Sequence, residues 1–328
     1  MIRDSILAAL ISFGVSAAAG PFVIPALRRL KIGQTVRADG PETHLKKSGT
    51  PTMGGVIFLL GIALASFIFI GKHSGITPVL FLTVSFGVIG FIDDFIKVVL
   101  KRSTGLLAWQ KFVLQLLVTA AFAWFLVRFE GISLDMAVPF CDKLVDPGWL
   151  GLPLLFFVVL GTDTGSNFTD GLDGLCSSVT AVIAAFFAIV AVTGLCGNEG
   201  ADAAILSAAV LGGLLAFLLF NSYPAKVFMG DTGSLALGGF VAATAYMLHL
   251  QLFLLLIAVI YVIEVLSVML QVSFFKLTHG KRIFKMAPIH HHFEKCGWSE
   301  SRVVTVFTVI TILACLLAVL ILGGNAGA

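Results

Sequence analysis

Charged residues are scarce in this sequence. Asp, Glu, Lys and Arg make up 12% of its 328 residues, about half the share in an average soluble protein. Hydrophobic residues make up 58%, which is more than one soluble core can bury. The composition therefore excludes a soluble domain and indicates an integral membrane protein. The net charge of +3 gives no reason to expect a nucleic acid as partner.

The sequence also lacks several motifs that mark common kinds of site. Its five cysteines show no CxxC spacing, so neither a zinc site nor a disulfide framework is indicated. Cys141 and Cys196 fall in loops on the same predicted side, which leaves a single disulfide open. No low-complexity segment or internal repeat is present. We therefore expect one transmembrane domain over residues 1–328.

Long apolar segments are what the sequence has in abundance. A bilayer core about 30 Å thick needs roughly 20 apolar residues per helix. The first such segment could be taken for a secretory signal, but it continues past two prolines to Arg28 and Arg29 and is long enough to span. The seam between the eighth and ninth apolar segments, near His249 and Gln251, is the least distinct boundary. The sequence predicts an all-α, polytopic membrane protein with ten transmembrane helices at about 5–27, 52–71, 78–97, 112–128, 150–167, 175–194, 202–220, 233–250, 252–275 and 303–322.

The orientation follows from the lysines and arginines, because cytoplasmic loops collect them. Four of the 21 fall on one side, namely Arg3, Lys72, Arg128 and Lys143. The other 17 fall in the loops on the opposite side. We therefore expect both termini outside the cytoplasm and five loops inside it.

Two adjacent carboxylates end the third segment, in the motif FIDDFIK. Asp93 and Asp94 point about 100° apart on a helix, so they cannot both face lipid at low cost. Lys97 follows one turn later and can compensate their charge. Two interpretations fit: a helix end that reaches water, or a polar site at the membrane surface.

The motif NFTDGLDGL places Asn167, Asp170 and Asp173 three residues apart. On a helix this spacing stacks them on one face, while Gly171 and Gly174 weaken the helix and allow a ligand close to the backbone. A broken helix at a membrane boundary is a common way to build a polar site. A simple turn capped by Asp and Asn is the alternative.

Two further motifs carry metal-binding and imidazole groups. Asp231, in FMGDTGSLALGG, lies between a glycine and a threonine at a helix start and suits a hard cation such as Mg²⁺. In MAPIHHHFE, His290, His291 and His292 are consecutive, so they fan around a helix and cannot all bind one metal. They face phosphates, or they form a solvated cluster. Glu264, in the ninth segment, serves either as a buried hydrogen-bonding group or as a polar lining for a lipid phosphate.

The motifs at one membrane face suit a site for phosphate esters, because they bring together acidic groups, cations, imidazoles and backbone that glycine leaves accessible. A nucleotide-linked substrate can reach that face from the cytoplasm, and a lipid phosphate can reach it along the bilayer. Transfer between the two is the chemistry we expect. An ion-coupled secondary transporter is the alternative from another class, but its sites lie near the midplane between repeated halves, and this sequence shows neither feature.

Six motifs spread along nearly the whole chain carry a family resemblance: KKSGTPTMGG, GFIDDFIKV, NFTDGLDGL, NSYPAKVFMGDTGSLALGG, EVLSVMLQV and MAPIHHHFE. Together they closely resemble the phospho-N-acetylmuramoyl-pentapeptide transferase family, within the polyprenyl-phosphate N-acetylhexosamine 1-phosphate transferase superfamily. Single motifs are shared with relatives that use N-acetylglucosamine donors, which are the alternative within the superfamily. The form PIHHHFE resembles the muramoyl-pentapeptide branch.

The resemblance implies a multi-pass enzyme of the bacterial cytoplasmic (inner) membrane, homodimeric and inhibited by nucleoside antibiotics. It would use Mg²⁺ to join UDP-N-acetylmuramoyl-pentapeptide to undecaprenyl phosphate, giving lipid I and UMP.

The resemblance also assigns roles to matching residues. Asp231 resembles the Mg²⁺ ligand, and Asp93 and Asp94 resemble an acidic pair that acts as base, nucleophile or metal organiser. The implied nucleoside pocket comprises Asn167, Asp170 and Asp173, with Phe228 stacking on uracil, and Gly171 and Leu172 in the same motif are implied to bind substrate. Further implied site residues are Lys47, Thr52, Lys111, Asn221, Gln271, His290, His291 and His292, of which His290 and His291 are assigned to catalysis.

Two mechanisms are open. A phosphate monoester has a second pKa of about 6, so the lipid phosphate is mostly a dianion at neutral pH and can attack directly. We favour this direct displacement, with Asp93 removing a residual proton or holding the nucleophile in line. The alternative is a two-step route through a phosphorylated Asp94 or Asp93.

Overall fold

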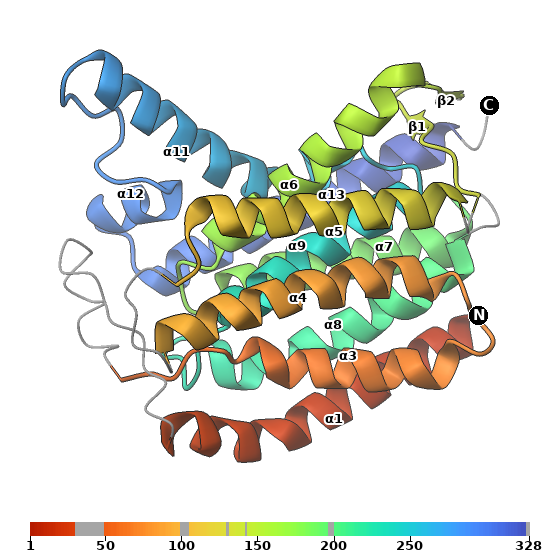
Figure 1. Ribbon diagram of the computed structural model, residues 1–328, viewed down its shortest axis with the longest axis horizontal. Helices are drawn as coiled ribbons and strands as arrows, with labels where there is room; N and C mark the ends of the chain where they lie inside the picture. Colours follow the sequence, from red (N-terminus) through yellow and green to blue (C-terminus); the bar gives the residue numbers. More distant parts are fainter. Residues whose placement is uncertain (30–48, 99–104, 129–130, 142, 196–199, 326–328) are drawn as a thin grey trace.

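The computed structural model describes residues 1–29, 49–98, 105–128, 131–141, 143–195 and 200–325, and most of this chain is helical (Figure 1). The helices are α1 (Ile2–Arg29), α3 (Gly55–Phe69), α4 (Ile76–Val98), α5 (Ala108–Arg128), α6 (Gly151–Thr169), α7 (Leu175–Thr193), α8 (Ala201–Asn221), α9 (Gly230–Met247), α10 (Leu254–Ile257), α11 (Val259–Leu277), α12 (Ile289–Lys295) and α13 (Glu300–Asn325). Two short strands, β1 (Met136–Ala137) and β2 (Leu144–Val145), pair antiparallel, and the 3-10 helix η1 (Gly148–Leu150) precedes α6.

Among the described residues, eight helices are long and apolar enough to cross a membrane: α1, α4, α5, α6 with η1, α7, α8, α11 and α13. Helix α3 is apolar but has only 15 residues. The helical, largely apolar structure fits the predicted polytopic membrane protein. Each of the ten predicted segments overlaps a helix, and the count of ten spans stays a prediction.

Helix α9 packs against α3, α4, α6, α7 and α8, and every residue from Thr232 to Met247 is buried. Small residues make this crowding possible. A Cβ at Gly238 would lie 2.5 Å from the Cα of Asp163 on α6, and one at Gly239 would lie 3.0 Å from the carbonyl oxygen of Leu82 on α4. Small residues let helices approach closely in membrane proteins, so the neighbours of α9 are held tightly against it.

The ninth predicted segment, 252–275, is broken in the structure. Helix α10 ends at Ile257, and α11 begins at Val259. The sequence has no proline or glycine there to mark the break. The two parts differ in their main neighbours, because α10 packs on α13 whereas α11 packs mainly on α6 and also contacts α13. The predicted seam near His249 does lie between helices, and His249 has a positive φ of 57°.

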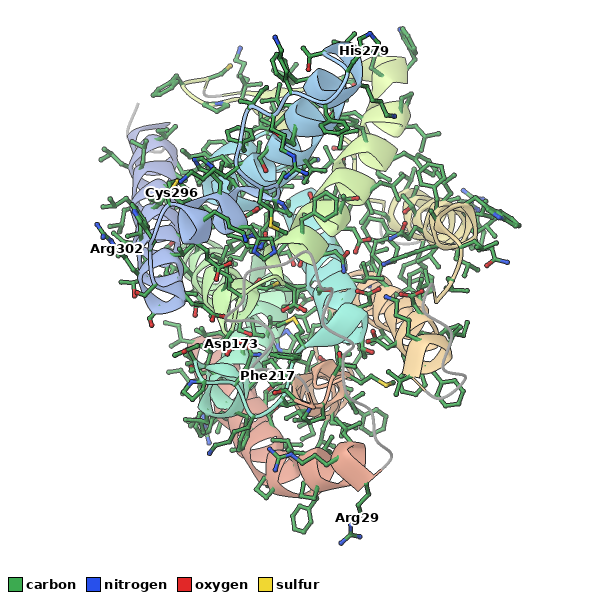
Figure 2. All side chains as sticks on the ribbon, turned by 90° about the vertical axis from the view of Figure 1, so that its left-hand side faces the viewer. Arg29, Asp173, Phe217, His279, Cys296 and Arg302 are labelled. Atoms are coloured by element: carbon green, nitrogen blue, oxygen red, sulfur yellow. The ribbon has the colours of Figure 1, made fainter. Side chains whose placement is uncertain are left out.

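The two ends of the molecule differ. The N-terminus, the β1–β2 hairpin and the end of α13 lie at the right-hand end of Figure 1, and α12 and the outer end of α11 lie at the left. Seen from that left-hand end, Asp173 lies near the middle of the molecule, between His279 and Arg29 at opposite edges (Figure 2). Which end faces the cytoplasm stays a prediction. Cys196 lies outside the described residues, so its pairing with Cys141 is untested.

The contact between α1 and α8 yields a stability prediction. A Cβ at Gly212 of α8 would lie 2.1 Å from the backbone oxygen of Ala9 on α1, so one helix must shift. We expect Gly212→Ala to cost about 1–3 kcal/mol, as overpacking does, and to lower the apparent unfolding temperature in detergent. The control is Gly14→Ala on α1, where no heavy atom lies within 4 Å. Equal unfolding temperatures for the two variants would contradict the close packing.

Candidate active site

Helix α9 starts against the last turns of α4. A Cβ at Gly90 of α4 would lie 2.0 Å from the backbone oxygen of Asp231, so only glycine permits this approach. Asp94, one turn further along α4, accepts hydrogen bonds from the backbone N–H groups of Asp231 (3.3 Å) and Thr232 (2.9 Å) and from Thr232 Oγ1 (2.7 Å). Asp94 thus caps the N-terminus of α9 from another helix.

Gly230 allows the chain to enter α9 beside that cap. Its φ is +74°, a conformation that side chains rarely adopt, and a Cβ there would lie 2.6 Å from Asp94 Oδ2 and 2.7 Å from Thr52 Oγ1. Thr52 therefore lies at the edge of this cluster, and its role in binding substrate stays a prediction. The segment that carries it runs beside Phe228, whose N–H donates to the Pro51 carbonyl at 2.8 Å.

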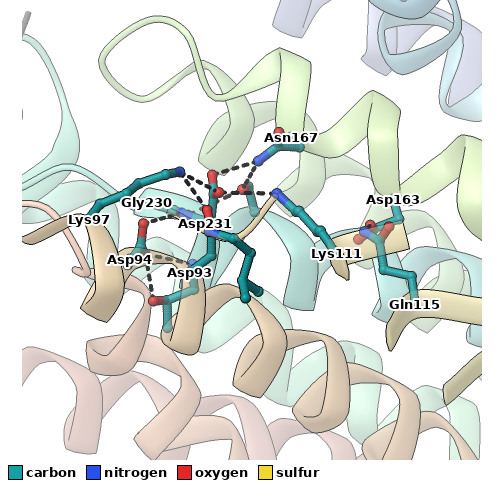
Figure 3. A network of polar contacts seen from close by, with 12 residues as sticks. Asp93, Asp94, Lys97, Lys111, Gln115, Asp163, Asn167, Gly230 and Asp231 are labelled. Atoms are coloured by element: carbon teal, nitrogen blue, oxygen red, sulfur yellow. Dashed lines mark hydrogen bonds and ion pairs between the residues drawn. The ribbon is translucent and has the colours of Figure 1, made fainter. Parts of the chain in front are cut away.

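Asp231 is the meeting point of four helices (Figure 3). Its Oδ2 accepts from Lys97 Nζ of α4 at 2.9 Å and from Lys111 Nζ of α5 at 3.1 Å. Its Oδ1 accepts from Asn167 Nδ2 of α6 at 2.9 Å. Burial alone would raise the pKa of Asp231, but a side-chain hydrogen bond with Asp93 and the charges of both lysines hold that pKa well below its usual range.

Asp93 lies on the other side of Lys97. Its Oδ2 is 2.5 Å from Lys97 Nζ, and its Oδ1 accepts from the backbone N–H of Leu106 at 2.6 Å. The side chain of Asp93 is 3% exposed, whereas that of Lys97 is 39% exposed. Lys97 therefore bridges two carboxylates from the surface of the cluster, and the two share its single positive charge.

The turn between α6 and α7 joins this cluster to its surroundings. The backbone of Gly230 hydrogen bonds to the Asp170 side chain, whose pKa burial raises well above its usual range, with a further rise from the charges of Asp231 and Asp94. Asp173 is turned toward another loop and accepts from the Ala225 N–H at 2.9 Å. The two acids of the motif thus hold the chain before α9 in place from two sides.

His290 reaches the same turn from α12. Its Nδ1 lies 3.0 Å from Glu264 Oε1 on α11, and both side chains are buried, at 1% and 0% exposure. A Cβ at Gly171 would lie 2.2 Å from His290 Nε2, so the imidazole packs directly on the glycine backbone. His291 pairs instead with Glu294 at 2.8 Å, and His292 Nδ1 accepts from the Lys285 N–H at 3.1 Å. Of the three histidines, His290 contacts the turn.

Other predicted site residues hold loops near the site. Asn221 accepts from Ser177 Oγ at 2.8 Å and donates to the Val227 carbonyl at 3.0 Å. Gln271 Oε1 accepts from the Ile283 and Phe284 N–H groups at 3.1 and 3.0 Å. Leu172 is buried in the core, and Phe228 is partly buried. Lys47 lies outside the described residues.

Several polar residues beside this cluster did not stand out in the sequence as site residues. Asp163 on α6 is fully buried, and its Oδ2 accepts from Gln115 Nε2 of α5 at 2.5 Å. Asp163 lies four residues before Asn167 on α6, and Gln115 lies four after Lys111 on α5, so the Gln115–Asp163 contact lies one turn from the contacts that Lys111 and Asn167 make with Asp231. Glu300 Oε1 accepts from the Asp173 N–H at 2.6 Å. The i, i+4 spacings to Lys111 and Asn167 were the signal in the sequence that could have found Gln115 and Asp163.

The side chains of the cluster indicate which kind of metal site they could form. Within the described ranges, no group of three or more His, Cys, Asp or Glu side chains could hold a metal ion. Mg²⁺, however, is usually held by one or two carboxylates together with substrate phosphates and water. The Asp231 and Asp93 carboxylates, joined through Lys97, fit that second arrangement.

Comparison with known proteins places these motifs in context. The model of Glycosyl transferase family 4 matches residues 76–249, and the phospho-N-acetylmuramoyl-pentapeptide-transferase signature 1 matches residues 47–59. The chain is 51% identical to the phospho-N-acetylmuramoyl-pentapeptide-transferase of Acetivibrio thermocellus, covering 96% of this chain and 94% of that one. The enzymes of the same name from Caldicellulosiruptor bescii and Clostridium perfringens are 50% and 47% identical, covering 96% and 95% of this chain and 96% and 97% of theirs.

The packing of His290 on Gly171 yields a prediction for activity. In Gly171→Ala the added Cβ would force the imidazole away from Glu264. We expect turnover to fall on the order of 100-fold, the cost of a displacement of about 1 Å at a reacting group. The control is Gly161→Ala on α6, where no heavy atom lies within 4 Å. Turnover in Gly171→Ala equal to that of the control would remove His290 from the site.

Proposed function

The chain belongs to the phospho-N-acetylmuramoyl-pentapeptide transferase family, and from this premise we propose that it joins UDP-N-acetylmuramoyl-pentapeptide to undecaprenyl phosphate in a Mg²⁺-dependent reaction. The products are lipid I and UMP. The chain is thus an enzyme, a transferase of peptidoglycan synthesis, and a membrane protein with several apolar helices. We place it in the bacterial cytoplasmic membrane as a homodimer that nucleoside antibiotics inhibit.

The observation that carries the proposal is the set of contacts around Asp231. One carboxylate holds two ammonium groups and an amide that come from three other helices. Phosphoryl transfer needs positioning and neutralisation of charge more than covalent help. Lys97 and Lys111 supply two cations for the diphosphate of the UDP-sugar. Asp231, with Asp93, would hold Mg²⁺, which neutralises charge on the diphosphate when it is bound.

We propose direct displacement as the mechanism. An oxygen of the lipid phosphate attacks the β-phosphorus of the UDP-sugar and forms a new P–O bond. The bond between that phosphorus and the bridging oxygen breaks, and UMP leaves with the oxygen and its electron pair. Lys97 and Lys111 neutralise the charge that moves onto the leaving phosphate.

The contacts of the adjacent carboxylates support different roles for them. Both oxygens of Asp94 accept hydrogen bonds from the first turn of α9, so Asp94 is proposed as the group that fixes Asp231. Asp93 is the better candidate to receive a residual proton or to align the lipid phosphate. A two-step route through Asp94 would first require that it release the start of α9. Trapping a phosphorylated aspartate during turnover without lipid acceptor would overturn direct displacement.

Recognition of the nucleoside is assigned to the turn after α6. Asn167 and Asp170 lie beside Asp231, and the partly buried Phe228 precedes it by three residues. We propose that Phe228 stacks on uracil and that Asp170 contributes hydrogen bonds near it. Asp173 supports this pocket through the Ala225 loop.

The direct test is the reaction itself. Purified protein in detergent, given UDP-N-acetylmuramoyl-pentapeptide, undecaprenyl phosphate and Mg²⁺, should release UMP and form lipid I in equal amounts, as measured by chromatography. Removal of Mg²⁺ with a chelator should stop the reaction, and its return should restore it. UDP-N-acetylglucosamine in place of the muramoyl donor should not support transfer. Preferential use of that second donor would assign the chain to another activity of the superfamily.

A second prediction tests Asp231. We expect Asp231→Asn to lower kcat by at least about 100-fold, because the variant loses the negative charge on which both lysines and the metal depend. Asp146→Asn is the matched control. Asp146 lies in the loop before α6 and accepts from the Gly148 N–H at 2.7 Å, a contact that an asparagine oxygen retains. Near-normal Mg²⁺-dependent turnover by Asp231→Asn, in protein that stays folded in detergent, would refute the metal role.

A further inference from the structure

Glu264 is a fully buried carboxylate in the middle of α11 that the proposed reaction has not used. Its neighbours along the helix are mostly apolar, and its side chain is 0% exposed. Ionisable residues within membrane helices are costly and commonly mark a functional site. A purely structural role would require that both its oxygens be satisfied, but Oε2 has no hydrogen-bond partner among the described residues.

The partner of Glu264 is His290. The distance from His290 Nδ1 to Glu264 Oε1 is 3.0 Å, and the imidazole is 1% exposed. A carboxylate that is ionised can only accept a hydrogen bond, and in that state the contact is made by a proton on Nδ1. This contact fixes the orientation of the ring, as the carboxylate does for a catalytic histidine in the Ser-His-Asp arrangement.

The other nitrogen, Nε2, is left without a hydrogen-bond partner in the described part of the chain, although it is buried. It lies against the backbone of Gly171. Leaving a buried polar atom without a partner is unfavourable. Asp170, the next residue, is hydrogen bonded to the backbone of Gly230 beside Asp231. The turn that contains Asp170 and Gly171 therefore lies between His290 Nε2 and the proposed diphosphate site.

We propose that Glu264 is a positioning residue that acts through His290. Its carboxylate holds the ring at Nδ1 so that Nε2 can meet a phosphate oxygen, and when the phosphate binds, Nε2 takes up a proton from solvent and donates it in a hydrogen bond to that oxygen in place of its contact with Gly171. The inference rests on the proposed function. The phosphate oxygen belongs either to the diphosphate of the UDP-sugar or to the lipid phosphate, and the two sources predict different kinetic effects.

The kinetic experiment compares Glu264→Gln and Glu264→Ala with Ser267→Ala. Glutamine keeps an oxygen for Nδ1–H but loses the charge, and alanine loses both. Ser267 lies one turn away on α11, is 3% exposed and donates only to the backbone carbonyl of Glu264 at 2.8 Å, so it controls for disturbance of the helix. We expect turnover to fall by about 10-fold in Glu264→Gln and about 100-fold in Glu264→Ala, the range for residues that orient a functional histidine.

The Michaelis constants distinguish the two phosphates. An increase in the KM of the UDP-sugar alone assigns the contact to the diphosphate, and an increase in the KM of undecaprenyl phosphate alone assigns it to the lipid. A fall in kcat with both KM values unchanged assigns the contact to the transition state. Turnover and KM values within twofold of the Ser267→Ala control, in folded Glu264→Gln and Glu264→Ala, would overturn the proposal.

A measurement on the unaltered chain keeps the proposal testable if the variants fail to fold. In protein labelled with ¹⁵N-histidine, the ring resonances of His290, assigned by their loss in His290→Asn, should show protonation at both nitrogens when UDP-N-acetylmuramoyl-pentapeptide or undecaprenyl phosphate is added. Resonances that respond to neither compound would refute the role of the pair. This readout does not depend on turnover, so its failure is distinguishable from failure of the proposed reaction, which the UMP assay reports.

Discussion

The first turn of α9 is partly buried, with Thr232 and Gly233 fully so, and the arrangement of the site depends on how its free N–H groups are satisfied. A helix begins with N–H groups that have no partner in the helix, and buried polar groups must be paired. Asp94 supplies that pairing from α4. Because Asp94 is fixed to the start of α9, its neighbours Asp93 and Lys97 are fixed beside Asp231. The positive end of the α9 dipole favours carboxylates at the same place. The cap and the proposed catalytic cluster are therefore parts of one structure.

The charges of the cluster explain why it suits a metal-bound diphosphate. If Asp93, Asp94, Asp231, Lys97 and Lys111 are all ionised, three negative charges face two positive ones. A UDP-sugar diphosphate carries about two negative charges and Mg²⁺ carries two positive ones, so together they leave that balance unchanged. The lipid phosphate brings further negative charge, with a second pKa of about 6. A hydrogen-bond donor for that phosphate is then needed within reach, and the proposed Nε2–H of His290, held in place by Glu264, fulfils that need.

Much of the cluster could be predicted from the sequence, because carboxylates, amides and glycines at the ends of apolar segments are recognisable without coordinates. The partners of those groups could not. Helical periodicity shows which face of a helix a residue occupies but not which helix lies opposite. Asp94 meets residues 137 and 138 positions away, and Glu264 meets His290 across a loop. The break at Ala258 was hidden for a similar reason. The residues at the break carry no signal for it, whereas the main helix neighbours of α10 and α11 differ, and those neighbours are visible only in the structure.

The three histidines lie in different surroundings, which three consecutive histidines in the sequence do not reveal. They occupy the first turn of α12, where consecutive residues point about 100° apart. Each consequently meets a different environment: Glu264 for His290, Glu294 for His291 and the Lys285 backbone for His292. His290 alone is almost fully buried and lies on the Gly171 turn. The three imidazoles therefore have different contacts. His290 Nε2 lies on the Gly171 turn beside the proposed site, while His291 and His292 hold α12 and the loop before it in the position from which His290 contacts that turn.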